Sequence, residues 1–379
     1  MSLTAFSIDI SLPFFPAIAS SLQSPLSAMP LIVTVYLLFM GVGNLVFGPL
    51  SDKYGRKPVL SGTLFVFIVG AIVCGLADSL RQLLVGRALQ GFAVGAAPVV
   101  ATAILRDMFS GRELGRSMAI STGIFSVGPI VAPLLGVGLA ELGGSWRTVF
   151  YATAVYAALL LLALLLTPET NKTPSADATK PSVLWRNSKT ILFHPQSGYF
   201  LMLSAITTVA MILIVSTSPA IFNNEFGITG AKFAVLFALH GTGIIVGQLL
   251  NHQLIAIVGI VKTALIAALI MGTSTMLIVL FALMGWLNEY WLSFLVAFFA
   301  VGYLSVVANS MTMLMQPHGD KAGLAASLRG ATSALVATVG SSALALFVQN
   351  SALLWGGALF GVSLISISLL YRWQRQHPN

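Results

Sequence analysis

The feature that most constrains this chain is the recurrence of long apolar stretches along its whole length. Only 8% of the residues are charged, against about 25% in an ordinary soluble domain. Twelve apolar stretches each have about the 20 residues that a helix needs to cross a bilayer. They cover residues 3–22, 30–50, 59–77, 82–104, 117–140, 146–167, 198–222, 231–251, 258–284, 289–315, 322–348 and 351–371. The sequence therefore predicts an all-α polytopic membrane protein with twelve transmembrane helices.

One long polar segment divides these stretches into two groups of six. It is rich in Pro, Ser, Thr and Lys and forms the longest gap in the hydropathy. We expect an N-terminal six-helix bundle at 1–167, a cytoplasmic linker at 168–197 and a C-terminal six-helix bundle at 198–379. Residues 182–194 place apolar side chains among basic ones, which predicts either a short helix on the membrane surface or a flexible linker.

The basic residues are distributed unevenly between the loops. With the N-terminus placed inside, most of the 19 Lys and Arg residues fall on the cytoplasmic side, and only Arg81, Arg147 and Lys232 fall outside. Cytoplasmic loops carry an excess of Lys and Arg, so we expect both termini in the cytoplasm. The formal charge of +8 then reflects topology, and we expect no nucleic-acid partner.

The sequence offers no support for metal, thiol or nucleotide chemistry. The one cysteine lies inside an apolar stretch, and the five histidines lack the i,i+4 spacing of a helical metal site. There is no G-x-x-x-x-G-K-[ST] phosphate loop, and no nucleophile–base pair indicates an enzyme. We expect no cofactor and no metal. His240 falls in a span, where we interpret it as a hydrogen-bonded packing residue.

Two charged residues lie within the apolar stretches of the N-terminal half. Asp9, in FSIDISLPFFPAIA, is the one carboxylate well inside a span, and a buried carboxylate without a fixed counter-charge is costly. Asp9 is therefore a candidate proton carrier, with a helix-start residue in contact with loop water as the alternative. Arg87, one turn from Gln90, must face protein or a water-filled cavity. It either alternates with a proton as the partner of Asp9 or forms a static pair with it.

Only eight residues precede Asp9, which is about 12 Å of helix at 1.5 Å per residue. Either Met1 lies at the membrane edge or the first turns of this span are missing, and of the two we expect a natural chain that begins earlier than Met1.

The most distinctive motif is the basic loop GPLSDKYGRK at Gly48–Lys57. A turn this basic between two spans marks a cytoplasmic loop, and Asp107 closes the fourth span on the same side. An ionic latch of these charges would bias one of two gating states. An exposed ion pair contributes only about 0–1 kcal/mol, so the latch must be a network or partly buried, with solvated loop charges as the alternative. The proposed gating residues are Gly48, Asp52, Gly55, Arg56, Lys57 and Asp107.

The fifth span combines glycine and proline in TGIFSVGPIVAPLLGVGLA. Proline removes backbone hydrogen bonds and glycine permits close helix contact, so this helix is expected to bend and to pack tightly. It is either a hinge between two gating states or a kinked structural helix. The residues concerned are Gly128, Pro129, Pro133 and Gly136.

Together these segments resemble the major facilitator superfamily, and most of all its twelve-span drug:proton antiporters of the Bcr/CflA branch. The resemblance covers most of the chain and is more specific in the N-terminal half. It rests on SIDISLPFFPAIA, GPLSDKYGRK, GRALQG, AILRDMF, GPIVAPLLG, WRTVF and AGLAAS. It implies a cavity between two six-helix bundles and export of small lipophilic compounds from the cytoplasm across a bacterial inner membrane. Protons moving inward would drive export, with Asp9 as the proton site and Arg87 as its coupling partner.

Further residues are candidates for the substrate cavity. Arg329 departs from the pattern of the branch, and either snorkels to the cytoplasm or faces the cavity and favours anionic or zwitterionic substrates. Aromatic and amide side chains within spans are the other candidates, although each can equally be a packing residue. The set is Tyr36, Phe39, Asn44, Gln90, Phe125, Tyr303, Asn309 and Arg329.

Two alternative functions stay open at this point. One is a dedicated exporter of a metabolite such as a sugar, a nucleoside or an amino-acid derivative. The other is a membrane sensor or scaffold that does not transport, which a costly buried carboxylate argues against. For the antiporter we expect a monomer whose partners are the lipid bilayer, protons and a small-molecule substrate.

Overall fold

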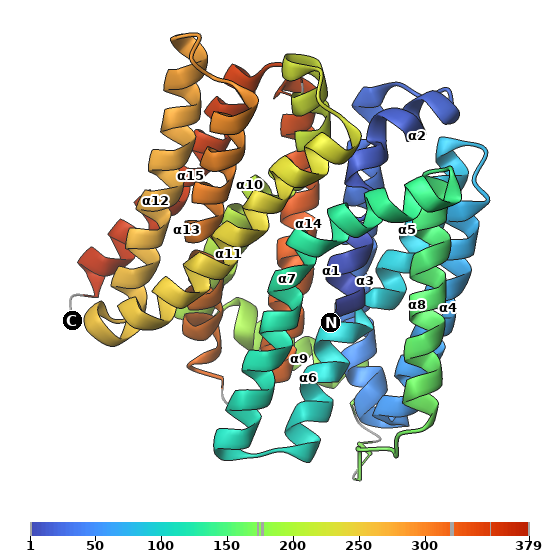
Figure 1. Cartoon of the computed structure of the whole chain (residues 1–379). Coiled ribbons are helices and arrows are strands. Elements are labelled where there is room, and N and C mark those ends of the chain that lie inside the picture. Colours follow the sequence, from blue (N-terminus) through green and yellow to red (C-terminus); the bar gives the residue numbers. More distant parts are fainter. Residues whose placement is uncertain (1, 173, 176–177, 319–321, 349, 378–379) are drawn as a thin grey trace.

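The computed structural model describes residues 2–172, 174–175, 178–318, 322–348 and 350–377. Every regular element in these ranges is a helix (Figure 1). Twelve helical stretches among them are long and apolar enough to cross a membrane. The prediction of an all-α protein with twelve spans is therefore confirmed, and the chain is a multi-pass membrane protein.

The N-terminal half contains the first six spans. The first and fourth spans are each divided into shorter helices, and the second begins with a 3-10 turn. The elements are α1 (Ser2–Asp9), η1 (Leu12–Phe14), α2 (Phe15–Ser21), η2 (Leu26–Ala28), α3 (Pro30–Tyr54), α4 (Arg56–Gly75), α5 (Leu80–Val94), α6 (Ala96–Met108), α7 (Gly111–Gly143) and α8 (Arg147–Leu165).

The C-terminal half lies beside the first and contains the other six spans (Figure 1). A short helix, α9 (Pro181–Leu192), connects the halves, so the linker holds the helix that the sequence offered as one of two interpretations. The six long helices that follow are α10 (Pro195–Phe226), α11 (Gly230–Val258), α12 (Ile260–Leu283), α13 (Glu289–Met315), α14 (Ala322–Val348) and α15 (Ala352–Gln376).

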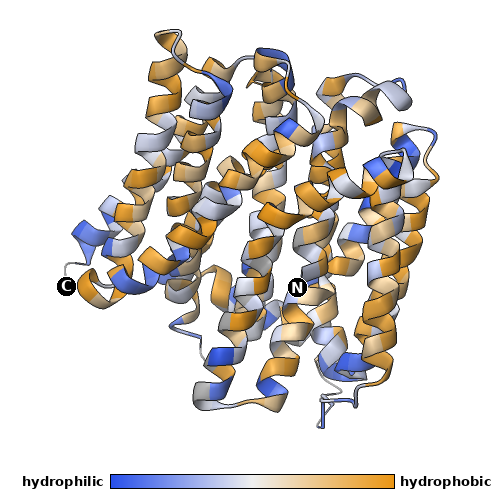
Figure 2. Cartoon of the chain, viewed as in Figure 1, coloured by the Kyte–Doolittle hydropathy of each residue, from blue (hydrophilic) through white to orange (hydrophobic). Residues whose placement is uncertain are grey.

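The surface of the helices matches a lipid environment. Apolar residues run along the helices, while polar residues gather at loops and helix ends (Figure 2). Large apolar side chains such as Phe65, Val155 and Val339 are exposed. Exposed apolar surface on this scale marks an interaction surface, and on twelve spanning helices that surface is the one that meets the bilayer.

Prolines break the first span close to Asp9. Helix α1 ends at Asp9, and both η1 and α2 carry a proline at one of their first two positions, Pro13 and Pro16. Proline donates no N–H and restricts the residue before it, so it begins a helix more readily than it continues one. The break leaves Asp9 at a helix end inside the N-terminal half.

The two most extensive contacts between the halves are those of α3 with α14 and of α7 with α11. Glycine allows the close approach in both pairs. A Cβ atom at Gly41 of α3 would lie 2.6 Å from the Cβ of Ala334, and one at Gly241 of α11 would lie 2.9 Å from the backbone nitrogen of Ile130. A larger side chain at either glycine would therefore push the halves apart.

Candidate functional site

Asp9 is buried in the N-terminal half without a fixed partner. Its residue is 5% exposed, and no hydrogen bond or ion pair of its carboxylate is found among the described residues. Ser7, two residues before Asp9 on α1, contacts the hydroxyl of the buried Tyr36, which brings the end of α1 close to Tyr36. Because Asp9 is buried, the structure does not favour the alternative of a helix-start residue in contact with loop water.

Arg87 is fully buried on α5 and is held by neutral groups. Its Nη1 donates to the carbonyl oxygen of Ser7 at 2.9 Å and to Oε1 of Gln90 at 3.1 Å, and its Nε donates to the carbonyl oxygen of Ile32 at 3.2 Å. The guanidinium lies over the ring of Tyr36, 4.2 Å from the ring centre. Its Nη2 has no acceptor in the described part of the chain. Arg87 is therefore not paired with Asp9 in this conformation, although Ser7 lies only two residues before Asp9.

Tyr36 connects the helix that carries Asp9 to the rest of this cluster. Its hydroxyl lies 2.5 Å from Oγ of Ser7, and Tyr36 is fully buried on α3. A cation stacked on an aromatic face gains about 2 kcal/mol or more when desolvated. Tyr36, Arg87 and Gln90, two of them predicted as cavity residues, thus form a buried polar cluster that positions the last turn of α1.

The basic loop forms a network around Arg56. Its Nη1 donates to Asp52 and, at 2.9 Å, to Oγ of Ser51, and its Nε donates to Oδ2 of Asp107 at 3.0 Å. The guanidinium is mostly buried, which satisfies the requirement that a latch be more than an exposed pair. These residues belong to α3, α4 and α6, so the network ties the N-terminal half together at one end and does not itself bridge the halves.

Gly48 connects this end of α3 to the other half. A Cβ atom at Gly48 would lie 3.2 Å from Cγ1 of Val99 on α6 and 3.5 Å from Oγ of Ser327 on α14. The loop network is therefore one helix turn from the place where α3 meets the C-terminal half.

Glu169 is a functional candidate that sequence reasoning missed. It follows α8, and its carboxylate accepts the backbone N–H groups of Arg56 and Lys57, each at 3.0 Å, which are the first residues of α4. Partial burial raises the pKa of Glu169, but the N–H groups of Asn171, Arg56 and Lys57 outweigh it and lower that pKa below its usual value. A carboxylate at a helix N-terminus is stabilising.

Gly55 and Lys57 complete the contact between the loop and the end of α8. Gly55 has φ +101°, and a Cβ atom there would lie 2.6 Å from Oε2 of Glu169, so only glycine fits. The Nζ of Lys57 donates to the carbonyl oxygens of Leu165 and Thr167, each at 2.8 Å. Lys57 thus caps the C-terminal end of α8 and does not join the carboxylates of the predicted latch.

The glycine- and proline-rich helix α7 lies between the first span and α11. It is one continuous helix that contains Pro129 and Pro133. A Cβ atom at Gly136 would lie 2.5 Å from the carbonyl oxygen of Ile10, the residue after Asp9. The predicted hinge helix therefore contacts the break in the first span on one side, and Gly241 of the other half through Pro129 and Ile130 on the other side.

The structure shows the surroundings of Asn309 and Asn44, two of the predicted substrate-cavity residues. Nδ2 of Asn309 donates to Oδ1 of Asn251 at 2.8 Å, and both amides are buried between α11 and α13, which is a packing arrangement. Asn44 is buried where α3 meets α14, close to Gly330, and its Oδ1 has no partner among the residues that the structure describes. Phe39 is exposed. The side chain of Phe125 lies outside the described residues.

His240 differs from its interpretation as a hydrogen-bonded residue. It is buried, but neither ring nitrogen has a partner among the described residues. Its ring stacks on Phe237, with 5.3 Å between the ring centres. His240 is thus a packing residue as expected, but the expected hydrogen bond is wrong for the described residues, because the ring packs against an aromatic side chain.

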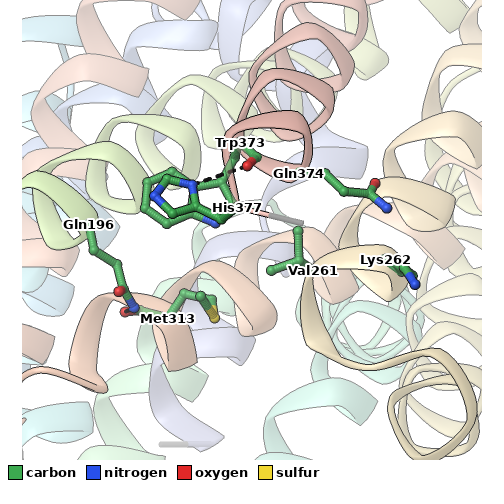
Figure 3. A pocket seen from close by; sticks show the side chains of 7 residues that line it. All are labelled: Gln196, Val261, Lys262, Met313, Trp373, Gln374 and His377. Atoms are coloured by element: carbon green, nitrogen blue, oxygen red, sulfur yellow. Dashed lines mark hydrogen bonds between the residues drawn. The ribbon is translucent and has the colours of Figure 1, made fainter. Parts of the chain in front are cut away.

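Two cavities are visible outside the cluster around Arg87. One has a volume of about 320 Å³ and lies where α10 and α12 begin and α13 and α15 end. It is lined by Gln196, Val261, Lys262, Met313, Trp373, Gln374 and His377 (Figure 3). The other, about 260 Å³, is mainly apolar and lies between α1, α7 and α8. Neither contains Asp9, Arg87 or Arg329. No group of three or more potential metal ligands occurs in the described ranges.

Two joined six-span halves with ionisable groups buried inside the spans define a class of protein, the secondary transporters. The family model of the Major Facilitator Superfamily matches residues 1–341, and the chain belongs to this superfamily. Both the fold and the family are those of transporters.

Relatives at moderate identity are bacterial transporters. The chain is 29% identical over 366 residues to "Uncharacterized MFS-type transporter YdgK" of Bacillus subtilis (strain 168), covering 94% of this chain and 89% of that protein. It is 34% identical over 236 residues to "Multidrug resistance protein MdtL" of Escherichia coli (strain K12 / DH10B), covering 61% of this chain. The match spans 58% of the length of MdtL.

Solved structures share the fold at low sequence identity. The xylose transporter XylE from E. coli, in a partially occluded inward-open conformation, has a TM-score of 0.78 at 12% identity, with 98% of this chain and 94% of that chain covered. The human organic anion transporter MFSD10 has a TM-score of 0.67 at 19% identity, with 97% and 96% covered. These likenesses establish the fold alone.

Proposed function

We propose that this transporter is a proton-coupled antiporter that exports small lipophilic drugs or related compounds. The observation that carries the proposal is Asp9, a buried carboxylate at a helix break. It has no fixed counter-charge among the described residues and lies close to the buried cluster of Arg87, Tyr36 and Gln90. The relationship to MdtL supports the drug class, since that relative is named a multidrug resistance protein.

The first step of the proposed cycle is proton binding at Asp9. A neutral carboxylic acid is tolerated in a buried site far better than a carboxylate. Within the described ranges Asp9 has no cationic partner, and Nη2 of Arg87 has no acceptor. This arrangement is the one expected when Asp9 carries a proton.

The second step is loss of that proton. A charged Asp9 needs a donor, and Nη2 of Arg87 is free to supply one. Arg87 already contacts the helix that carries Asp9, because its Nη1 donates to the carbonyl oxygen of Ser7 on α1. Rotation about the break at Ile10 and Ser11 would bring the carboxylate to the guanidinium, so that a proton and Arg87 alternate as its partner.

The third step passes this movement to the other half. Ile10 packs against Gly136 of α7, and α7 packs against α11 through Pro129 and Ile130. A shift of the helix break would therefore act on the contact of α7 with α11, one of the two most extensive contacts between the halves. Alternating access requires two arrangements of the halves that differ by only a few kcal/mol, and the Arg56 network is proposed to bias one of them.

The proposal includes the setting of the protein. The distribution of Lys and Arg supports a bacterial inner membrane location with both termini in the cytoplasm. The transporter is proposed to act as a monomer, driven by the proton gradient without a cofactor.

The test is drug-induced collapse of a preset pH gradient in inverted membrane vesicles. At least one compound from a panel of amphenicols, bicyclomycin-like compounds, lipophilic cations and quinolones should dissipate the gradient with the wild type and not with Asp9→Asn. Glu141→Gln is the matched control, because Glu141 is exposed at the end of α7 and should behave like the wild type.

Two results would count against the proposal. Equal activity of Asp9→Asn and the wild type would mean that another group carries the proton. If no compound acts on wild-type vesicles, a dedicated metabolite exporter or a sensor without transport becomes the better account.

A further inference from the structure

Arg329 is a cation inside the C-terminal half, and no carboxylate among the described residues is paired with it. The acidic residues of this half are Glu225, Glu289 and Asp320. Glu225 accepts the backbone N–H of Ala352, and Glu289 pairs with Lys232 at 3.1 Å, while Asp320 lies outside the described residues. Among the described residues, the guanidinium has one long contact to Oγ of Ser204 at 3.5 Å, and its Nε has no partner.

The guanidinium points into the protein and does not snorkel to the nearby helix ends. Ser204 lies nine residues into α10 and Arg329 seven residues into α14, so they stand about 13 Å and 10 Å from the starts of these helices. Tyr303 lies deeper, about 18 Å from the same end of α13, and is within electrostatic reach of Arg329. The side chain is thus directed toward the middle of the spans.

The neighbours of Arg329 supply further hydrogen-bonding groups. Oγ of Ser204 faces the guanidinium, and the Tyr303 hydroxyl lies close to the hydroxyl of Thr208. A guanidinium presents its N–H donors in a fork that matches carboxylate, sulfonate or phosphate oxygens, and hydroxyl groups can add further donors. Three helices, α10, α13 and α14, therefore bring a positive charge and hydroxyl groups to one place.

The site around Arg329 lies next to the contact between the halves. Gly330, the next residue, lies against Asn44 of α3, with 2.8 Å between Nδ2 of Asn44 and the position of a Cβ atom. Arg329 itself is only partly buried, so part of its side chain borders open space. In transporters of this architecture substrates bind near the middle of the membrane where the repeats meet.

We propose that Arg329, with the hydroxyl groups of Ser204 and Tyr303, binds an anionic group of the transported compound. The substrates are then small lipophilic anions or zwitterions that carry a carboxylate, sulfonate or phosphate. Lipophilic cations are repelled by the same charge. The inference rests on the proposed export function, because it assigns the substrate class of the proposed exporter.

The test is equilibrium binding to the purified full-length chain. Two pairs of probes separate charge from shape: nalidixate with its methyl ester, and naphthalene-2-sulfonate with naphthalene-2-sulfonamide. The wild type should bind at least one anion about ten- to hundredfold more tightly than its neutral counterpart, as charge-assisted hydrogen bonds predict. Arg329→Gln should abolish this preference, and Arg329→Lys should restore part of it.

Controls separate a binding role from a structural one. Arg81→Gln removes an exposed arginine at the start of α5 and should keep the preference for the anion. Arg329→Gln should melt at the wild-type temperature or above it without ligand, because the lost cation has no carboxylate partner. A clearly lower melting temperature would assign Arg329 a structural role and overturn the proposal.

Two binding results would also overturn it. One is a wild type that binds neither anion more tightly than its neutral counterpart, and the other is a preference that survives in Arg329→Gln. Binding needs no proton gradient, so this test can fail while proton-coupled export stands. It can equally succeed when vesicles show no drug-driven proton flux.

Discussion

Replacing Arg56 with glutamine should destabilise the protein by about 2–3 kcal/mol, a value that follows from burial. A hydrogen bond to a charged group contributes about 1.5–3 kcal/mol when shielded from water, whereas an exposed ion pair contributes about 0–1 kcal/mol. The side chain of Arg56 is 10% exposed, that of Asp107 23% and that of Asp52 49%. We therefore assign about 2 kcal/mol to the Asp107 pair and less than about 1 kcal/mol to the Asp52 pair.

The chain offers a matched arginine–aspartate pair as a control. Nη2 of Arg147 lies 3.3 Å from Oδ1 of Asp78, with side chains 30% and 90% exposed. Because this pair is open to solvent, Arg147→Gln should cost only about 1 kcal/mol, including its contact with the ring of Trp146. Both free energies of unfolding can be measured by equilibrium unfolding in mixed micelles, with tryptophan fluorescence as the signal.

A double-mutant cycle sharpens the comparison. Arg56→Gln combined with Asp107→Asn should show a coupling free energy of about 1–2 kcal/mol, because the two groups touch. Equal costs of Arg56→Gln and Arg147→Gln, or a coupling near zero, would refute the reasoning that burial makes this network strong.

Other contacts lead to further expected outcomes. Glu169→Gln should lower the melting temperature near pH 7 and match the wild type at a pH well below about 4.3. The folded-state pKa of Glu169 is lowered. Its carboxylate therefore stabilises the protein fully above the unfolded-state pKa, and this stabilisation is lost as the pH falls through the folded-state pKa. A melting-temperature difference that does not depend on pH would contradict this. Asn309→Ala should cost about 1–3 kcal/mol in unfolding free energy by leaving the Asn251 amide unpaired, and a change below about 0.5 kcal/mol would contradict the buried pair. Gly136→Val should abolish drug-driven proton flux in vesicles by displacing Ile10, while wild-type flux in that variant would exclude the proposed contact.

The sequence predicted the twelve helices because lipid imposes a simple rule on length and composition. It also placed Asp52, Arg56 and Asp107 at the same end of the protein, since loops on one side of a membrane must lie together. The structure brings these three residues into contact as expected. The number of spans and the grouping of the loop charges thus depend on short-range patterns that are visible in the chain.

The partners of individual side chains could not be predicted in the same way. Glu169 caps α4 across more than a hundred residues of chain, and no local pattern signals such a contact. Arg87 was expected to meet a carboxylate but is held by two carbonyl oxygens, the Gln90 amide and a ring, because the end of α1 leaves the carbonyl of Ser7 free, which hydropathy does not reveal. His240 was expected to be hydrogen-bonded, and only the structure shows that its ring nitrogens have no partner among the described residues.

The central claim is that Asp9 exchanges a proton for substrate, and proton release from purified protein tests it most directly. In a weakly buffered solution with a pH indicator, adding a compound that binds should release protons from the wild type. Asp9→Asn should bind the same compound and release none, while Glu141→Gln should release as many protons as the wild type. Proton release by Asp9→Asn equal to that of the wild type would contradict the account.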